Sequence, residues 1–135
     1  TPLKLVAGRF CLRRDLQPDA KLHFIHWYST KAQIYLNEKV QTLAARMGVE
    51  PAGVKIQDLG YRWGSCGRGN RLYFNWKTIL LPREIVEYVV VHELTHLHEP
   101  HHTPQFWKRV ERVLPDYERR KGWLAKNGIG VEGID

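Results

Sequence analysis

The sequence contains few cysteines and no long hydrophobic segment. Its 135 residues include only Cys11 and Cys66. Two cysteines are too few for the disulfide framework that stabilises small secreted domains, so we expect a reducing, cytoplasmic location. No run approaches the roughly 18–20 apolar residues that a membrane-spanning helix needs, and the start has no signal-peptide pattern. These absences predict a protein without a membrane partner.

Positive charge exceeds negative charge. The chain carries 21 Lys and Arg residues against 14 Asp and Glu residues, which gives a net charge of +7 and a pI near 9.6. A positive field concentrates anions, so association with nucleic acid or with phosphates is one expectation. The basic residues are spread along the chain, however, and a solvated surface is the simpler interpretation for most of them.

The segment His92-Glu93-Leu94-Thr95-His96 has the spacing of a metal site. On a helix, which we expect over residues 82–98, His92 and His96 lie on one face with Cβ atoms about 5–6 Å apart. That distance suits one metal ion, most naturally a catalytic Zn²⁺. Glu93 lies beside the metal, where its carboxylate can take a proton from a metal-bound water. The segment therefore predicts metal-assisted hydrolysis.

The residues around this segment predict that the helix is buried. Its middle is apolar nearly all round, and prolines at 82 and 100 are placed to begin and end it. Burying two histidines and a carboxylate without partners is costly, and shared coordination of a cation satisfies them together. Pro100 forces the chain to turn, which lets His101 or His102 approach the first two ligands.

A catalytic zinc needs a third protein ligand. His102 is our preferred candidate, and His101 is the main rival because periodicity says nothing about a loop. His98 lies about 200° round the helix from His96 and points away, and Glu99 is displaced by Pro100. Two later glutamates, Glu111 and Glu118, are weaker candidates, because either would leave His102 without a role.

The remaining patterns predict an α+β domain. Apolar residues at spacings of three and four give a long helix from Pro18 to about Gly48, which should cover a sheet. Residues 54–59 are typical of a strand, and segments 61–66 and 71–76, separated by glycines, are typical of an antiparallel hairpin. Thr103-Pro104 should begin another helix, with one more at 116–126. We expect the long N-terminal helix to pack on a small, mostly antiparallel sheet, with the buried metal-binding helix and C-terminal helices beside it.

Several ordered motifs resemble the YgjP-like metallopeptidase family over roughly residues 54–126. They are Arg62-Trp63-Gly64-Ser65-Cys66, Asn75-Trp76, Val90–His96, His102-Thr103 with Phe106-Trp107, and Pro115-Asp116-Tyr117. The resemblance implies a zincin-type α+β domain in which His92, His96 and His102 bind zinc and Glu93 is the catalytic carboxylate. It also implies relatedness to SprT-like metalloproteases, which act on proteins crosslinked to DNA, although some family members have been named UTP pyrophosphatases.

The resemblance also suggests how the chain is divided. The family usually carries more β structure before its first long helix, so residues 1–16, where we expect a short strand, resemble the remnant of an N-terminal β region. Residues 17–128 would form the catalytic domain. The glycine-containing residues 129–135 would be a flexible tail.

The sequence leaves two classes of substrate open, a polypeptide and a nucleotide. A peptide can pair with an exposed sheet edge as an extra strand, whereas a nucleoside triphosphate such as UTP needs several cations around its phosphates. Basic residues on or beside the hairpin could contact such anions or could form a solvated face. They are Arg62, Arg68, Arg71 and Lys77. Tyr117 could stabilise an oxyanion or pack in the core.

A function of another class is a nucleic-acid-binding module with a structural zinc. Such a site is closed by four protein ligands, and the sequence offers three good ones beside a well-placed base. The stretch from Arg62 to Cys66 has no role that we can derive from the residues. Gly64 permits a close backbone approach or a bulge. Cys66 could be a small buried hydrophobe, or it could be a fourth zinc ligand that closes the site and makes the metal structural.

Overall fold

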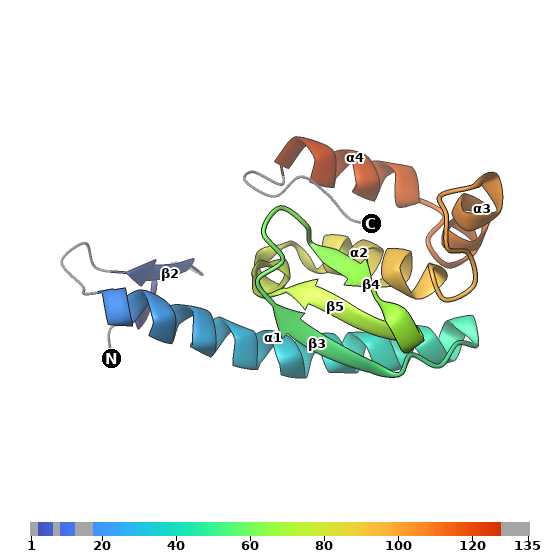
Figure 1. Ribbon diagram of the computed structural model, residues 1–135. Helices are drawn as coiled ribbons and strands as arrows, with labels where there is room; N and C mark the ends of the chain where they lie inside the picture. The colour runs from blue at the N-terminus through green and yellow to red at the C-terminus, as the bar shows by residue number, and fades with distance from the viewer. Residues whose placement is uncertain (1–2, 7–8, 13–17, 128–135) are drawn as a thin grey trace.

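A long helix lies along a small three-stranded sheet in the computed structural model, which describes residues 3–6, 9–12 and 18–127, with side chains from residue 20 onwards (Figure 1). The chain then adds three helices after the sheet. The elements are β1 (Leu3–Val6), β2 (Arg9–Leu12), α1 (Pro18–Met47), β3 (Gly53–Gln57), β4 (Gly64–Cys66), β5 (Arg71–Asn75), α2 (Arg83–Thr95), α3 (Pro104–Val113) and α4 (Tyr117–Asn127), with short 3₁₀ turns at Arg68–Asn70 and Trp76–Leu80.

Helix α1 forms where the spacing of apolar residues predicts it. Ala32, Leu36, Val40 and Leu43 are three or four positions apart and are all nearly inaccessible to solvent. They form one stripe that packs against the sheet and α2. The helix ends before Gly48, whose φ of +69° is the left-handed conformation that glycine adopts without strain. The expected long N-terminal helix is confirmed.

The sheet has the strand order β3-β5-β4. β4 and β5 form the expected antiparallel hairpin, in which Gly64 pairs with Phe74. β3 runs parallel to β5, with Val54 opposite Leu72. The α+β class is confirmed, but the sheet is mixed rather than mostly antiparallel. The reason is that β5 lies between β3 and β4, and a strand pattern does not show which strands are neighbours.

Helix α2 occupies the centre of the molecule. Ile85, Val86, Val89, Val90, Val91 and Leu94 are all fully buried, so the middle of the helix is apolar nearly all round, as expected. The sheet and α1 pack against it, and α3 and α4 contact it as well. α3 begins at the predicted cap, where the Thr103 Oγ1 accepts a hydrogen bond from the Phe106 N–H at 3.4 Å and Pro104 follows.

The ends of the chain are described in part. β1 and β2 form an antiparallel pair of their own, which agrees with the strand expected early in the chain. The predicted tail at residues 129–135 lies outside the described residues. Within the described residues, no helix combines the length and the apolar character that crossing a membrane would require.

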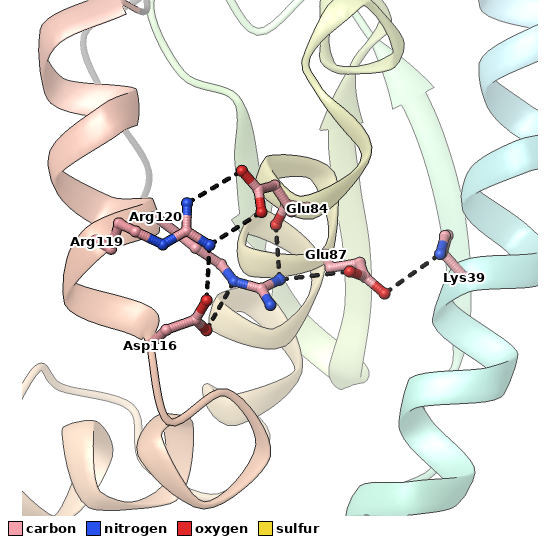
Figure 2. A network of polar contacts seen from close by, with 6 residues as sticks. All are labelled: Lys39, Glu84, Glu87, Asp116, Arg119 and Arg120. Atoms are coloured by element: carbon pink, nitrogen blue, oxygen red, sulfur yellow. Dashed lines mark hydrogen bonds and ion pairs between the residues drawn. The ribbon is translucent and has the colours of Figure 1, made fainter.

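A network of charged side chains joins α4 to α2 and α2 to α1 (Figure 2). The Arg119 guanidinium donates to both carboxylate oxygens of Glu84, at 3.1 and 2.9 Å, and to Asp116 at 2.7 Å. The Arg120 side chain donates to Asp116 at 2.9 Å and to the Glu84 carbonyl at 2.9 Å. Arg120 and Lys39 each contact Glu87 at 3.4 Å. These contacts hold α4 in place over α2.

The network predicts a pH dependence of stability. The hydrogen bond from Arg119 is the main cause that lowers the pKa of both Glu84 and Asp116 below their usual values. The contribution of the network to the free energy of unfolding should therefore be fully present above about pH 4, where these carboxyls ionise even in the unfolded chain. It should be lost as the pH falls through their lowered pKa values in the folded state. Because 40–55% of each of these side chains is exposed to solvent, the effect on Tm should be a few degrees at most.

Thermal unfolding of an Arg119→Gln variant tests this. The gap in Tm between wild type and variant should be largest at pH 7 and should close towards pH 3. Arg68→Gln, which removes an exposed arginine of the hairpin turn, is the matched control and should show little gap at either pH. A gap for Arg119→Gln that is the same at pH 7 and pH 3 would count against the network.

Candidate metal centre

Helix α2 positions His92, Glu93 and His96 at the place where it ends. His92 is 3% exposed and Glu93 is fully buried. The helix ends at Thr95, earlier than the predicted residue 98, and His96 caps it with helical φ and ψ of −62° and −16°. The i, i+4 relation is therefore kept, and the two imidazole centroids are 5.1 Å apart.

The early end of α2 has a local cause. The N–H groups of His96, Leu97 and His98 bond to carbonyls three residues back, which tightens the last turn. Pro100 has no N–H and disfavours the helical conformation for the residue before it. The chain then reverses before α3 begins, which carries His102 back towards α2.

Three imidazoles converge at this reversal. The Nε2 atom of His102 lies 3.1 Å from Nε2 of His92 and 3.2 Å from Nε2 of His96. Among the described residues, these three histidines form the group whose ligand atoms lie within 4.8 Å of one another. His101 and His102 are both exposed, but His101 lies outside the group, so the geometry agrees with our preference for His102.

The other rivals make different contacts. His98 is exposed, and the Glu99 carboxylate accepts a hydrogen bond from Arg109 Nε at 3.2 Å. Glu111 is exposed on α3, and Glu118 accepts a hydrogen bond from the Tyr117 hydroxyl at 3.4 Å. Coordination by His102 remains a prediction, but none of these four side chains belongs to the converging group.

The donor set fits a zinc ion. Two nitrogens that share a tetrahedral zinc at about 2.0–2.1 Å lie about 3.3 Å apart, close to the 3.1 and 3.2 Å seen between these rings. A neutral imidazole has one N–H, so the Nε2 of His102 cannot donate to both neighbours. One cation that accepts a lone pair from each ring satisfies all three nitrogens.

A backbone carbonyl fixes the orientation of His96. Its Nδ1 lies 3.1 Å from the carbonyl oxygen of Glu99. A carbonyl can only accept, so Nδ1 carries the proton and Nε2 presents a lone pair to the centre. No sequence pattern indicates this contact, because it depends on how the turn after α2 folds.

Aromatic rings surround the imidazoles. The buried Phe106 ring lies 4.7–4.9 Å from all three, and Trp107 lies 5.8 Å from His92 and from His102. Both come from the first turn of α3. These rings shield part of the imidazole surface from water, which strengthens electrostatic interactions at the centre.

Strand β4 approaches Glu93 at Gly64. A Cβ atom added to Gly64 would lie 3.0 Å from Cγ and 3.2 Å from Oε2 of Glu93. Any larger residue would push against the carboxylate, so glycine is needed here for close contact. This gives the motif Arg62–Cys66 a role that the sequence alone did not supply: it places a bare backbone beside Glu93.

Two buried polar side chains hold this strand in position. Asn75 Nδ2 donates to the carbonyls of Gly60 and Arg62 at 3.3 and 3.1 Å, and Thr78 Oγ1 donates to the Trp63 carbonyl at 2.9 Å. The Asn75 N–H also bonds to the Trp63 carbonyl. The residues before Gly64 are therefore fixed by bonds from β5 and the turn that follows it.

Substituting Gly64 by alanine should displace Glu93 by a few tenths of an ångström. We expect kcat to fall by about tenfold, since a 1 Å misplacement can cost about a hundredfold, and stability to fall by about 1 kcal/mol from overpacking. Gly122→Ala is the matched control, because no atom lies within 4 Å of its added Cβ. Equal kcat values for the two variants would show that the Gly64 contact does not position Glu93.

The electrostatic setting also affects a neighbouring tyrosine. Tyr88 is 1% exposed and its ring lies 5.9 Å from the His92 ring. Burial, and then the negative charge of Glu93, raise the pKa of Tyr88 well above its usual value. Tyr88 is therefore a neutral phenol at every pH at which the protein would work.

The remaining predicted site residues lie around the hairpin and on α4. Tyr117 stacks on Trp107, with the two ring centroids 5.5 Å apart, and its hydroxyl donates to Glu118. Desolvation and the Glu118 charge raise its pKa. Lys77 lies 5.7 Å from the Trp76 ring. Three arginines are exposed on or beside the hairpin: Arg62, Arg68 and Arg71. Their predicted contacts with substrate, and the oxyanion role of Tyr117, stay predictions.

Comparisons with known proteins agree with this geometry. The model of the YgjP-like metallopeptidase domain matches residues 9–127. Among solved structures, the metallopeptidase zymogen of Pyrococcus abyssi abylysin aligns with a TM-score of 0.65 and 18% identity, covering 73% of this chain and 98% of that chain. At that identity the likeness concerns the fold. A search of curated proteins gives no match.

Proposed function

Because the chain belongs to the YgjP-like metallopeptidase family, we propose that it is a zinc-dependent hydrolase that cleaves peptide bonds. In this proposal His92, His96 and His102 hold one catalytic Zn²⁺ and Glu93 is the general base. The observation that carries it is the convergence of three imidazole nitrogens next to a buried carboxylate. The donor set contains no thiolate, and three histidines leave one position of a tetrahedral ion open, as in catalytic zinc sites.

Each residue has a separate task. Zinc, when bound, acts as a Lewis acid and lowers the pKa of a coordinated water to about 7. Glu93 accepts a proton at its carboxylate and can return it to the leaving amine. Gly64 lets the strand backbone lie against that carboxylate. The Glu99 carbonyl keeps His96 in the tautomer that leaves Nε2 unprotonated.

The sheet supports a polypeptide as substrate. β4 is the last strand of the order β3-β5-β4, so one of its edges is not paired with a described strand. An extended peptide can add to such an edge through backbone hydrogen bonds. Since Gly64 in β4 contacts Glu93, a peptide added along β4 would run beside the general base. Anionic stretches of the substrate could then meet Arg62, Arg68 and Arg71, which lie next to the same strand.

An assay with two substrate classes tests the proposal. Purified protein of measured zinc content is offered an unfolded polypeptide and, separately, the four nucleoside triphosphates. We expect peptide fragments by mass spectrometry and no release of pyrophosphate. Pyrophosphate release from UTP without peptide cleavage would instead assign the pyrophosphohydrolase activity. No turnover of either class, together with salt-sensitive DNA binding, would indicate a nucleic-acid-binding module.

A further inference from the structure

A cavity away from the three histidines is lined by positively charged side chains. Its volume is about 240 Å³, and it lies between the end of α1, the turn after α2 and α3. No carboxylate lines it, unlike the cavity of about 290 Å³ beside α1, which includes Glu38 and Glu87. The lining residues are Arg46, Met47, His98, Arg109, Arg112 and Val113.

The arginines of this cavity are poorly neutralised. Within the described residues, Arg46 and Arg112 take part in no ion pair, and Arg109 has one, between its Nε and Glu99 Oε1 at 3.2 Å. Arg119 and Arg120, by contrast, are each paired with two carboxylates (Figure 2). Arg109 and Arg112 are three positions apart on α3, a spacing at which like charges repel. A bound anion would relieve that repulsion.

The chemistry of the lining selects the kind of anion. Guanidinium groups are planar forks that bind phosphate oxygens in pairs. The volume lies below the roughly 300 Å³ at which pockets for drug-sized ligands begin, so it suits a phosphate or diphosphate group and not a whole nucleotide. We propose that this cavity is a phosphate-binding site formed by Arg46, Arg109 and Arg112.

The site is connected to the candidate metal centre. Arg109 lines the cavity and also holds the Glu99 carboxylate, and the Glu99 carbonyl accepts the Nδ1–H of His96. A phosphate in the cavity competes with Glu99 for Arg109. Its binding therefore changes how firmly Glu99 is held, and with it the orientation of the His96 imidazole. This linkage goes beyond the proposed hydrolysis. Through it, the concentration of phosphate could change the orientation of His96 at the metal centre.

Titration calorimetry of the zinc-loaded protein with inorganic phosphate, at constant ionic strength, tests the site. We expect Arg46→Gln and Arg112→Gln each to weaken phosphate binding by about tenfold, the usual effect of losing one charged hydrogen-bond donor. Lys126→Gln removes the same charge from an exposed position at the end of α4 and should leave the affinity unchanged. If all three variants bound phosphate with the same affinity, the proposal would be overturned, because only the net charge of the protein would then matter.

Nuclear magnetic resonance locates the phosphate. Saturating phosphate should shift the resonances of Arg109, Arg112 and the His96 ring in the wild type, and these shifts should disappear in Arg112→Gln. Shifts of the three histidines that persist in Arg112→Gln would overturn the proposal, since phosphate would then be bound at the metal centre. ADP and pyrophosphate show whether the phosphate group itself is recognised, whichever molecule carries it. If Arg112→Gln binds both more weakly than the wild type does, the phosphate group is what binds. If Arg112→Gln binds both as tightly as the wild type does, the proposed site is overturned.

Discussion

Glu93→Gln is expected to keep bound zinc at the wild-type stoichiometry and to lower kcat on an unfolded polypeptide by about 10²–10⁴-fold, the usual contribution of a general base. Glutamine has nearly the same shape as glutamate and can occupy the same space beside Gly64. It cannot accept the proton, however. Because the loss concerns the chemical step, kcat should fall while KM changes little.

The control for this variant is Glu111→Gln, which makes the same chemical change at an exposed position of α3. It should retain wild-type kcat. Zinc content, measured by mass spectrometry of the metal, accompanies each assay so that a loss of metal is not mistaken for a loss of base. Full turnover by a zinc-loaded Glu93→Gln protein would refute the role of Glu93.

His102→Ala is expected to have the second large effect, a loss of both zinc and activity. Removing an outer-shell partner of a metal ligand typically costs about 10–100-fold in metal affinity, and removing a ligand itself should cost more. Two imidazoles, His92 and His96, would remain, and the third nitrogen that lies 3.1–3.2 Å from them would be gone. The measurement is zinc affinity by competition with a chelator of known affinity.

His101→Ala provides the comparison that isolates this residue. His101 is adjacent in sequence and exposed, but lies outside the converging group. Its substitution should leave zinc affinity and turnover close to wild type. If His101→Ala released zinc and His102→Ala kept it, the assignment of the third ligand would have to be exchanged.

The local parts of the fold could be predicted from the sequence. The stripe from Ala32 to Leu43 and the cap at Thr103-Pro104 depend on residues within a few positions of one another, and the structure confirms both elements. The spacing of His92 and His96 is local as well. The sequence does not predict the parallel pairing of β3 with β5, because that pairing depends on which strand lies in the middle of the sheet. Side chains alternate along a strand with a period of two whatever the strand order is, so this pattern does not reveal the neighbours.

The metal centre also combines local features, which the sequence predicts, with non-local contacts, which it does not. His101 and His102 could not be separated by periodicity, because both lie in the chain reversal after Pro100. The approach of Gly64 to Glu93 joins residues far apart in sequence, and only packing of β4 against α2 makes it visible. The Asn75 and Thr78 bonds that hold this strand are also non-local. Motif resemblance pointed to Gly64, Asn75 and Glu93 but not to Thr78, and the physical reason for all four required the fold.

X-ray absorption at the zinc edge of the purified protein reports the ligands of the bound ion, so it tests whether His92, His96 and His102 hold a catalytic zinc. We expect three imidazole nitrogens at about 2.0–2.1 Å and one further light atom from solvent, without sulfur. A sulfur scatterer at about 2.3 Å, as Cys66 would supply, would contradict it and would indicate a closed structural site.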